Sequence, residues 1–130
     1  NESDTANEVN ALRGKSVLGI YFSNEAMARG FLVVYKSAES GAANTIIGDA
    51  QDGGDLVAMG FDSGKPQLDA IRSGIILGSV TQNPYQIGYQ AVSLAVKASK
   101  GESISSVDTG AKWYDKTNID DPDIAQLLYE

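Results

Sequence analysis

The sequence predicts an α/β fold, a parallel sheet flanked by helices in three layers. Three short runs of apolar, β-branched and aromatic residues predict buried strands at 17–22, 56–61 and 75–81. Each run is followed by a segment whose apolar residues recur at helical spacing. Alternation of strands and helices in one chain is typical of a parallel sheet with crossover helices. A chain of 130 residues is long enough for one modest core.

Two helices are expected around the first strand. Asp4 is expected to cap a helix that runs to about Leu12, and Gly14 ends it. A second helix is predicted from 25 to 38, because its apolar residues keep helical spacing: Met27, Phe31, Val34 and Ala38. Gly30 inside this helix costs roughly 1 kcal/mol relative to alanine. Close packing of the helix on the sheet would explain the glycine.

The middle of the chain contains a turn-rich segment and a short helix. Residues 39–55 are rich in Gly, Asn and Asp and predict turns, either as an insertion loop or with a short extra strand at 45–47. After the second strand, Ser63 is expected to cap a helix that has Pro66 in its first turn and ends at Gly74. Leu68 and Ile71 should face the core in this helix.

The last third of the chain predicts one long helix, one strand and one short helix. The long helix is expected from 85 to 100, after Asn83-Pro84, with an apolar stripe along it: Ile87, Ala91, Leu94, Ala95 and Ala98. Residues 107–114 alternate loosely and predict a strand. Asp121 and Pro122 predict the start of a final helix.

Composition excludes several classes of function. The net charge is −7 and the ten basic residues are scattered, which argues against a nucleic-acid surface. The chain has no Cys and no His, so metal sites with nitrogen or sulfur ligands and dyads built on these residues are excluded. No apolar run approaches the roughly 20 residues of a membrane span. We therefore expect no metal, no cofactor and no catalytic residue.

Polar side chains follow all three predicted strands, at the point where each strand ends. Asn24 follows the first strand, Asp62 the second and Gln82 the third. Ligands of open parallel sheets bind beyond the carboxyl ends of the strands. A carboxylate accepts from two neighbouring hydroxyls, and amides both donate and accept, so this set suits a neutral sugar. Each residue also has a plain structural interpretation: Asn24 as a helix cap, Asp62 as a turn residue and Gln82 as a solvent-facing loop residue.

An enzyme is the weaker interpretation of the same residues. A glycoside-processing enzyme needs two carboxylates across the sugar, and Glu25 with Asp62 is the only sensible couple. We expect Glu25 to point into the first turn of its helix instead. The sequence GDAQDGGD at 48–55 lacks the Lys-Ser/Thr pair of a phosphate loop. Trp113 and Tyr114 could stack on a sugar ring, although aromatic residues on a late strand more often belong to the core or an interface.

Four motifs in order resemble one known family: SNEAMARGF, LVAMGFDSGKPQLDAIRSG, GSVTQNPYQIGYQAV and TGAKWYDKTNID. They resemble the C-terminal part of the type I periplasmic sugar-binding proteins, the ribose- and galactose-binding relatives that serve ABC transporters. The resemblance covers nearly the whole chain except 39–55. It implies two flavodoxin-like α/β lobes joined by a hinge, with a pentose or hexose bound between them by Asn24, Asp62 and Gln82. It also implies a membrane permease as partner and a periplasmic or other extracytoplasmic location, with a lipid anchor left open.

The resemblance also implies that the chain consists of three parts. Family members are much longer, so it implies a fragment, an incomplete fold without the N-terminal lobe. Residues 1–82 would be the sugar-binding part of the C-terminal lobe. Residues 83–106 would cross the hinge and place a helix on the absent lobe, and 107–130 would return as a hinge strand and C-terminal helix. Without that lobe, the apolar helix stripe and the bare edge of strand 17–22 predict self-association.

One alternative function shares this fold. The chain could be the effector-binding core of a LacI-type transcriptional regulator whose DNA-binding part lies elsewhere. The motif TGAKWYDKTNID resembles the transporter branch more closely. By resemblance, Gln82 favours a ribose-like ligand.

Overall fold

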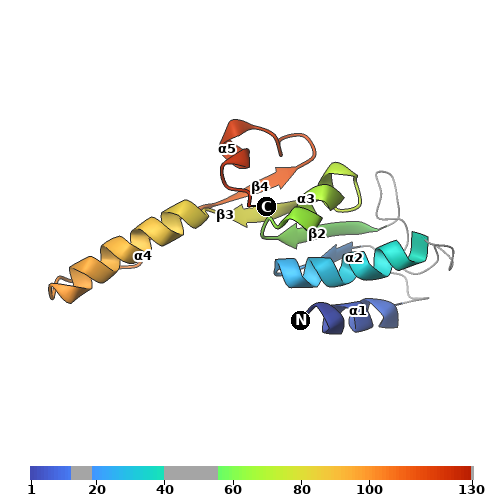
Figure 1. Cartoon of the computed structure of the whole chain (residues 1–130), viewed down its shortest axis with the longest axis horizontal. Helices are drawn as coiled ribbons and strands as arrows, with labels where there is room; N and C mark the ends of the chain where they lie inside the picture. Colours follow the sequence, from blue (N-terminus) through green and yellow to red (C-terminus); the bar gives the residue numbers. More distant parts are fainter. Residues whose placement is uncertain (13–18, 40–55, 130) are drawn as a thin grey trace.

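A computed structural model describes residues 1–12, 19–39 and 56–129 of the chain (Figure 1). The order of elements is α1 (Glu2–Ala11), β1 (Gly19–Tyr21), α2 (Glu25–Glu39), β2 (Val57–Phe61), α3 (Lys65–Arg72), β3 (Gly78–Gln82), α4 (Pro84–Ser99), β4 (Ala111–Asp115) and α5 (Pro122–Ala125). The turns and the optional strand that we predicted within 40–55 lie outside the described residues. All the other predicted helices and strands are present, with boundaries that differ by a few residues.

The strands form one mixed sheet in the order β1-β2-β3-β4. β1, β2 and β3 are parallel, and β4 pairs antiparallel with β3, so that Val80 lies opposite Trp113. The predicted α/β class, a mostly parallel sheet with flanking helices, is therefore confirmed. Parallel pairing brings the carboxyl ends of β1, β2 and β3 to the same edge of the sheet. The three polar residues predicted to bind a ligand are at or just beyond these ends.

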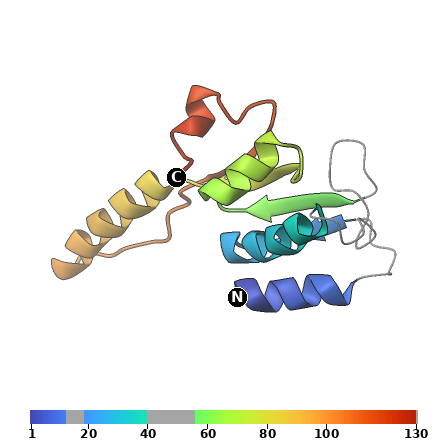
Figure 2. The ribbon, with the colours of Figure 1, turned by 45° about the vertical axis from the view of Figure 1, so that its right-hand side comes forward.

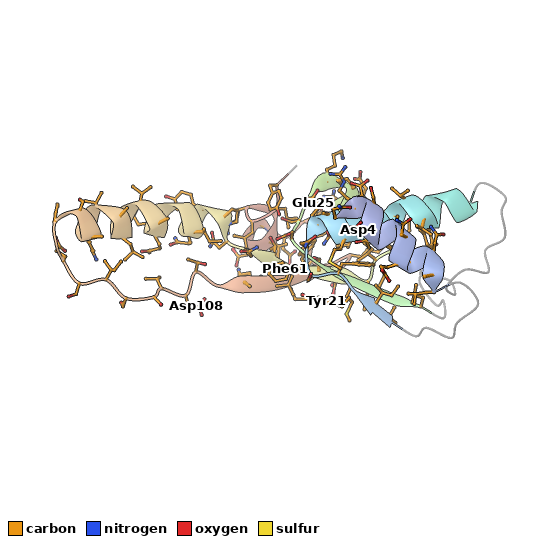
Figure 3. All side chains as sticks on the ribbon, turned by 90° about the horizontal axis from the view of Figure 1, so that it is seen from below. Asp4, Tyr21, Glu25, Phe61 and Asp108 are labelled. Carbon is orange, nitrogen blue, oxygen red and sulfur yellow. The ribbon has the colours of Figure 1, made fainter. Side chains whose placement is uncertain are left out.

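Helices α1, α2 and α3 lie on one side of the sheet (Figure 3). The two crossovers, β1-α2-β2 and β2-α3-β3, step in the same direction along the sheet, and right-handed crossovers then place both helices on the same face. On the other face, Tyr21 and Val57 remain exposed, at 55% and 42%. Among the described residues, the helices therefore cover one face of this part of the sheet.

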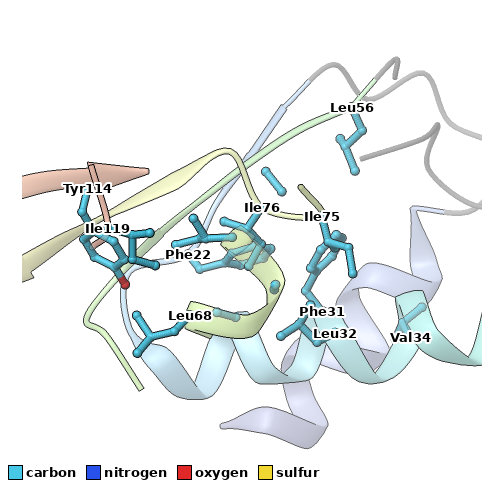
Figure 4. Packing of buried hydrophobic residues seen from close by; sticks show 14 of the residues in the cluster. Phe22, Phe31, Leu32, Val34, Leu56, Leu68, Ile75, Ile76, Tyr114 and Ile119 are labelled. Atoms are coloured by element: carbon cyan, nitrogen blue, oxygen red, sulfur yellow. The ribbon is translucent and has the colours of Figure 1, made fainter. Parts of the chain in front are cut away.

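The core fills the space between the sheet and these helices (Figure 4). The Phe22 and Phe31 rings lie 5.0 Å apart at its centre. The described residues predicted to face inward from α2 and α3 include Phe31, Leu68 and Ile71, and all three are at most 1% exposed. Helical and strand periodicity therefore located the core correctly in this part of the chain.

Two predicted helix caps are wrong. Asn1, not Asp4, caps α1, and Asp4 is the third residue of a reciprocal capping box with Asn1. Gly64 takes the cap position of α3, while Ser63 is fully buried and accepts a hydrogen bond from Thr81 Oγ1 at 3.1 Å. The cap of α1 is decided by the local capping box, and at α3 the buried hydrogen bond with Thr81 holds Ser63 instead.

Gly30 has a different role from the one predicted. A Cβ at this position would overlap Glu2 O and lie 2.8 Å from Thr5 Cβ, and both atoms belong to α1. The glycine therefore permits close approach of α1 to α2, not of α2 to the sheet. The exposed ion pair between Arg29 and Glu2, at 3.1 Å, lies beside this contact.

The third strand begins later than predicted, at Gly78 instead of Ile75. Gly74 has a φ of 81°, and the amides of Ile75 and Ile76 both donate to Ala70 O at the end of α3. These bonds hold the first residues of the apolar run to the helix end, so the strand cannot start before them. Ile76 is nevertheless fully buried.

Helix α4 projects away from the rest of the molecule (Figures 1 and 2). No residue of α4 is buried, and several large apolar side chains on it are exposed: Tyr85, Ile87, Tyr89, Val92 and Val96. After α4 the chain runs back to the sheet as β4, and α5 begins at Pro122 as predicted, with Asp121 at its cap position. Within the described ranges, no helix is both long and apolar enough to span a membrane.

Candidate functional site

Asp62 and Gln82 meet at the carboxyl edge of the sheet. Gln82 is the last residue of β3, and its Nε2 donates to Asp62 Oδ1 at 3.0 Å. The other carboxylate oxygen, Oδ2, accepts from the backbone N–H of Glu25 at 3.1 Å. Strand order therefore brings two of the three predicted residues into direct contact. Gln82 is exposed and Asp62 is half-buried, so both remain open to a ligand.

Asn24 lies at the start of α2, next in the chain to Glu25, which contacts Asp62. Its Oδ1 accepts from Met27 N at 3.0 Å, which is a helix-capping bond. The side-chain oxygen of Asn24 therefore caps α2, as the structural interpretation of this residue predicted. Its exposed amide nitrogen makes no hydrogen bond within the described part of the chain, so Asn24 can cap α2 and still donate outward. Among the described residues, no hydrogen bond joins Asn24 to Asp62 or Gln82 directly.

The backbone of Asp62 takes a conformation that non-glycine residues rarely adopt. Its φ is 74°, in the left-handed region. Its N–H donates to Val80 O at 2.9 Å, and its carbonyl accepts from Tyr114 Oη at 2.8 Å, Ser79 Oγ at 2.9 Å and Gln67 Nε2 at 3.1 Å. The strained conformation persists because these surrounding bonds determine it.

Tyr114 lies in the core and not on the ligand side. It is fully buried, and burial raises the pKa of its hydroxyl to about 12, so the hydroxyl stays protonated and donates over the whole physiological range. Sequence reasoning considered Tyr114 only as a ring that could stack on a sugar, and it did not consider Ser79 or Gln67 for the site. The available signal was the pair Ser79 and Thr81, two polar residues at inward positions of a strand.

Glu25 contacts Asp62 through its backbone, while its carboxylate lies at the start of the next helix. The Glu25 carboxylate lies against Gly64, where a Cβ would overlap it, at the start of α3. Only the backbone N–H of Glu25 contacts Asp62.

Trp113 lies on the open face of the sheet. A Cβ at Gly78 would overlap the Trp113 ring, so the indole lies across that glycine. Its Nε1 donates to Asp115 Oδ2 at 2.9 Å, and hydrogen bonds from Thr117 and Trp113 hold the pKa of Asp115 below its usual range. Trp113 is 39% exposed, and among the described residues it makes no hydrogen bond to Asp62 or Gln82.

Two other features of the described residues do not extend the site. A shallow pocket runs along α3 and is lined by Lys65, Pro66, Asp69, Ala70, Ser73 and Ile75. None of the three predicted residues lines it. Within ranges 1–12, 19–39 and 56–129, no group of acidic residues is arranged to hold a metal ion.

Asp62 and Gln82 thus present an oriented carboxylate and an exposed amide at the carboxyl edge of the sheet, and Asn24 directly precedes Glu25, whose N–H donates to Asp62. In open α/β sheets, small ligands bind beyond this edge. The chain belongs to the periplasmic binding protein domain family, whose model matches residues 1–103. The predicted resemblance to type I periplasmic sugar-binding proteins is thereby confirmed. A comparison with curated proteins found no match.

Solved structures agree with this family. An ABC transporter, LacI family transcriptional regulator from Brachyspira murdochii is 86% identical, with a TM-score of 0.85 over 100% of this chain and 41% of its own. An ABC transporter solute binding protein from Agrobacterium vitis with bound D-fucose is 26% identical, with a TM-score of 0.80 over 99% of this chain and 41% of its own. A carbohydrate transporter solute binding protein from Agrobacterium radiobacter in complex with D-arabinose is 30% identical, with a TM-score of 0.73 over 98% of this chain and 39% of its own. The chain thus spans about two fifths of the length of the structures it matches.

Proposed function

We propose that this chain is part of the sugar-binding component of an ABC transporter and performs no catalysis. The observation that carries the proposal is the Asp62 carboxylate, which is held between Gln82 Nε2 and Glu25 N at the carboxyl edge of the sheet. Its remaining lone pairs suit two adjacent sugar hydroxyls. Asn24 and Gln82 would add amide groups on either side, so the three residues would act together on one pentose or hexose.

Similar proteins support this ligand class. The Agrobacterium structures hold D-fucose and D-arabinose, which are monosaccharides without a charged group. A neutral polyol needs the mixed donors and acceptors that amides and a carboxylate supply. A site of this kind discriminates against ligands that lack the hydroxyls, because its own polar groups would then be left unpaired.

We further propose the architecture and partners of the whole protein. Residues 1–82 would form part of one lobe, 83–106 would cross the hinge and place α4 on the other lobe, and 107–130 would return through the hinge. The sugar would be enclosed when the lobes close, and a membrane permease would recognise the closed form. The family's description supports an extracytoplasmic location.

A second function is favoured by one specific observation. The name of the 86% identical structure combines ABC transporter with LacI family transcriptional regulator. Under this alternative the same site would sense a sugar effector and the complete protein would bind DNA. The complete reading frame separates the two: an export signal before this domain supports the transporter, and a helix-turn-helix supports the regulator.

The sugar site can be tested by NMR titration of this chain with D-arabinose, D-fucose and D-ribose. We expect shifts in the amides around Asn24, Asp62 and Gln82, with a dissociation constant of about 1 mM, because the contacts of the proposed second lobe are missing. Asp62→Ala should weaken binding by about tenfold to a hundredfold, since charge-assisted hydrogen bonds are lost. Asp69→Ala is the matched control, because Asp69 is an exposed carboxylate on α3 outside the site.

Two results would count against the proposal. Shifts confined to the pocket along α3 would place binding elsewhere, and unchanged spectra at molar sugar would remove the site altogether. Micromolar binding by this chain alone would instead overturn the part of the proposal that assigns half of the contacts to a second lobe.

We also propose that the chain self-associates. Helix α4 carries exposed Tyr85 and Val92, at 71% and 67%, and β1 is an edge strand within the described sheet. Burial of such apolar surface favours association by about 25 cal/mol per Å². Sedimentation at increasing concentration should show dimers or larger species, and Val92→Lys should reduce them. A wild-type chain that sediments as a monomer at the highest concentration would contradict self-association.

A further inference from the structure

We infer that Gln67, Ser79 and Tyr114 are positioning residues that hold Asp62 in its ligand-binding conformation. They would act on the proposed sugar without touching it, so the inference rests on the proposed function. Its basis is the convergence of three buried side-chain donors on one backbone carbonyl, Asp62 O.

The three donors come from three different elements. Gln67 belongs to α3, Ser79 to β3 and Tyr114 to β4, and each residue is 0% exposed. Ser79 Oγ donates to Asp62 O and accepts from Gln67 Nε2, so the donors also bond to one another. A network of this kind, closed off from water, is rigid because any displaced member leaves a buried polar group unpaired.

The orientation of Gln67 is fixed by its neighbours. Its Nε2 lies within hydrogen-bond distance of Phe61 O, Asp62 O and Ser79 Oγ. Its Oε1 is the one buried side-chain polar atom of the described residues that has no partner. Rotating the amide would bring Oε1 against two carbonyl oxygens, so the donor orientation is retained although the oxygen goes unpaired.

The adjoining strand leaves room for this amide. A Cβ at Gly60 would lie 2.6 Å from Gln67 Nε2 and 3.3 Å from Ser79 Oγ. A glycine at this position of β2 is therefore required for the network to form beside Asp62.

The network fixes where the Asp62 carboxylate points. The N–H of Asp62 is held by Val80 O and its carbonyl by the three donors, and together these bonds maintain the φ of 74°. With the backbone fixed, the side chain meets Gln82 Nε2 and Glu25 N, one on each oxygen. Loss of a donor would let the peptide relax toward the negative φ values that aspartate prefers and would move the carboxylate away from both partners.

The same strand offers a matched control. Thr81 lies two residues after Ser79 on the same buried face, and it is also 0% exposed. Its hydroxyl is within hydrogen-bond distance of Ser63 Oγ, Gln82 O and Leu127 O, but not of Asp62. Thr81→Val therefore removes one buried hydroxyl from β3, as Ser79→Ala does, and leaves all three bonds to the Asp62 carbonyl in place.

The test compares Ser79→Ala and Tyr114→Phe with Thr81→Val and needs two readouts. The first is solvent exchange of the Glu25 amide without sugar, because that N–H donates to Asp62 Oδ2. The second is the D-arabinose or D-fucose titration described above. We expect Ser79→Ala and Tyr114→Phe to speed Glu25 exchange and weaken sugar binding, each by about tenfold, and Thr81→Val to change both by less than about twofold. Tyr114→Phe keeps the comparison decisive if Ser79→Ala fails to fold.

The outcomes separate the inference from the proposed function. If Thr81→Val acts as strongly as Ser79→Ala, or if neither Ser79→Ala nor Tyr114→Phe changes Glu25 exchange, the three residues are structural only and the inference is overturned. If the wild type binds no sugar, the proposed function fails, and the exchange readout still decides whether the network positions Asp62.

Discussion

Raising the pH from 10 to 12 is expected to remove about 2 kcal/mol of folding free energy through Tyr114 alone. Burial raises the pKa of this hydroxyl from 10.0 to about 12 in the folded chain. In the unfolded chain Tyr114 ionises near pH 10. Between pH 10 and 12 the unfolded state therefore binds fewer protons than the folded state, and stability falls as the pH rises. The contribution is complete below pH 10 and is lost as the pH passes 12.

Urea unfolding between pH 8 and 12 measures this loss, with Trp113 fluorescence as the signal. Tyr114→Phe is the control, because it keeps the ring in the core and removes the ionisable group. Other tyrosines and the lysines ionise in both proteins, so the difference between the two curves isolates Tyr114. Parallel curves from pH 10 to 12 would show that Tyr114 ionises equally in both states, contrary to its burial.

Two glycine-to-alanine changes in helices are expected to have opposite signs. Gly30→Ala should destabilise the chain by up to about 2 kcal/mol, since overpacking against α1 costs about 1–3 kcal/mol and the gain in helix propensity returns about 1 kcal/mol. Gly88→Ala should stabilise it by about 1 kcal/mol, because a Cβ at Gly88 meets nothing within 4 Å. The substitution is the same, and only the space around the new methyl differs.

Thermal or urea unfolding of both variants tests this pair. NMR spectra of Gly30→Ala should also show the largest changes in α1, where Glu2 O and Thr5 Cβ lie nearest the new methyl. If Gly30→Ala is as stable as Gly88→Ala, the close contact between α1 and α2 does not exist in solution.

Much of this fold could be predicted because local patterns and tertiary structure agree. Apolar runs and helical spacing identified β1, β2, β3, α2 and α4 with small boundary shifts. The errors occurred where a distant contact decided between local options. Gly30 could be assigned to a close approach, but only the fold shows that α1 is the neighbour. Ser63 is a good cap by type, yet a buried hydrogen bond with Thr81 holds it instead.

Part of the candidate site could likewise be predicted from the sequence, and part of it could not. The rule that parallel strands end at a common edge correctly placed Asp62 beside Gln82. The cap interpretation of Asn24 was also available from the sequence and applies to its oxygen. The donors to Asp62 O could not be predicted, because Gln67, Ser79 and Tyr114 are separated in the chain and each fits an ordinary core role. No spacing rule relates a tyrosine on a returning antiparallel strand to an aspartate 52 residues earlier.

The antiparallel strand β4 has a practical consequence for where this unit may be cut. The family match ends at residue 103, before β4 begins. A polypeptide trimmed to that limit would retain Asn24, Asp62 and Gln82 yet lack the hydroxyl of Tyr114 that bonds the Asp62 peptide. The smallest unit that keeps all three hydrogen bonds to the Asp62 carbonyl therefore extends beyond the limit of the family match, at least through β4, which ends at Asp115.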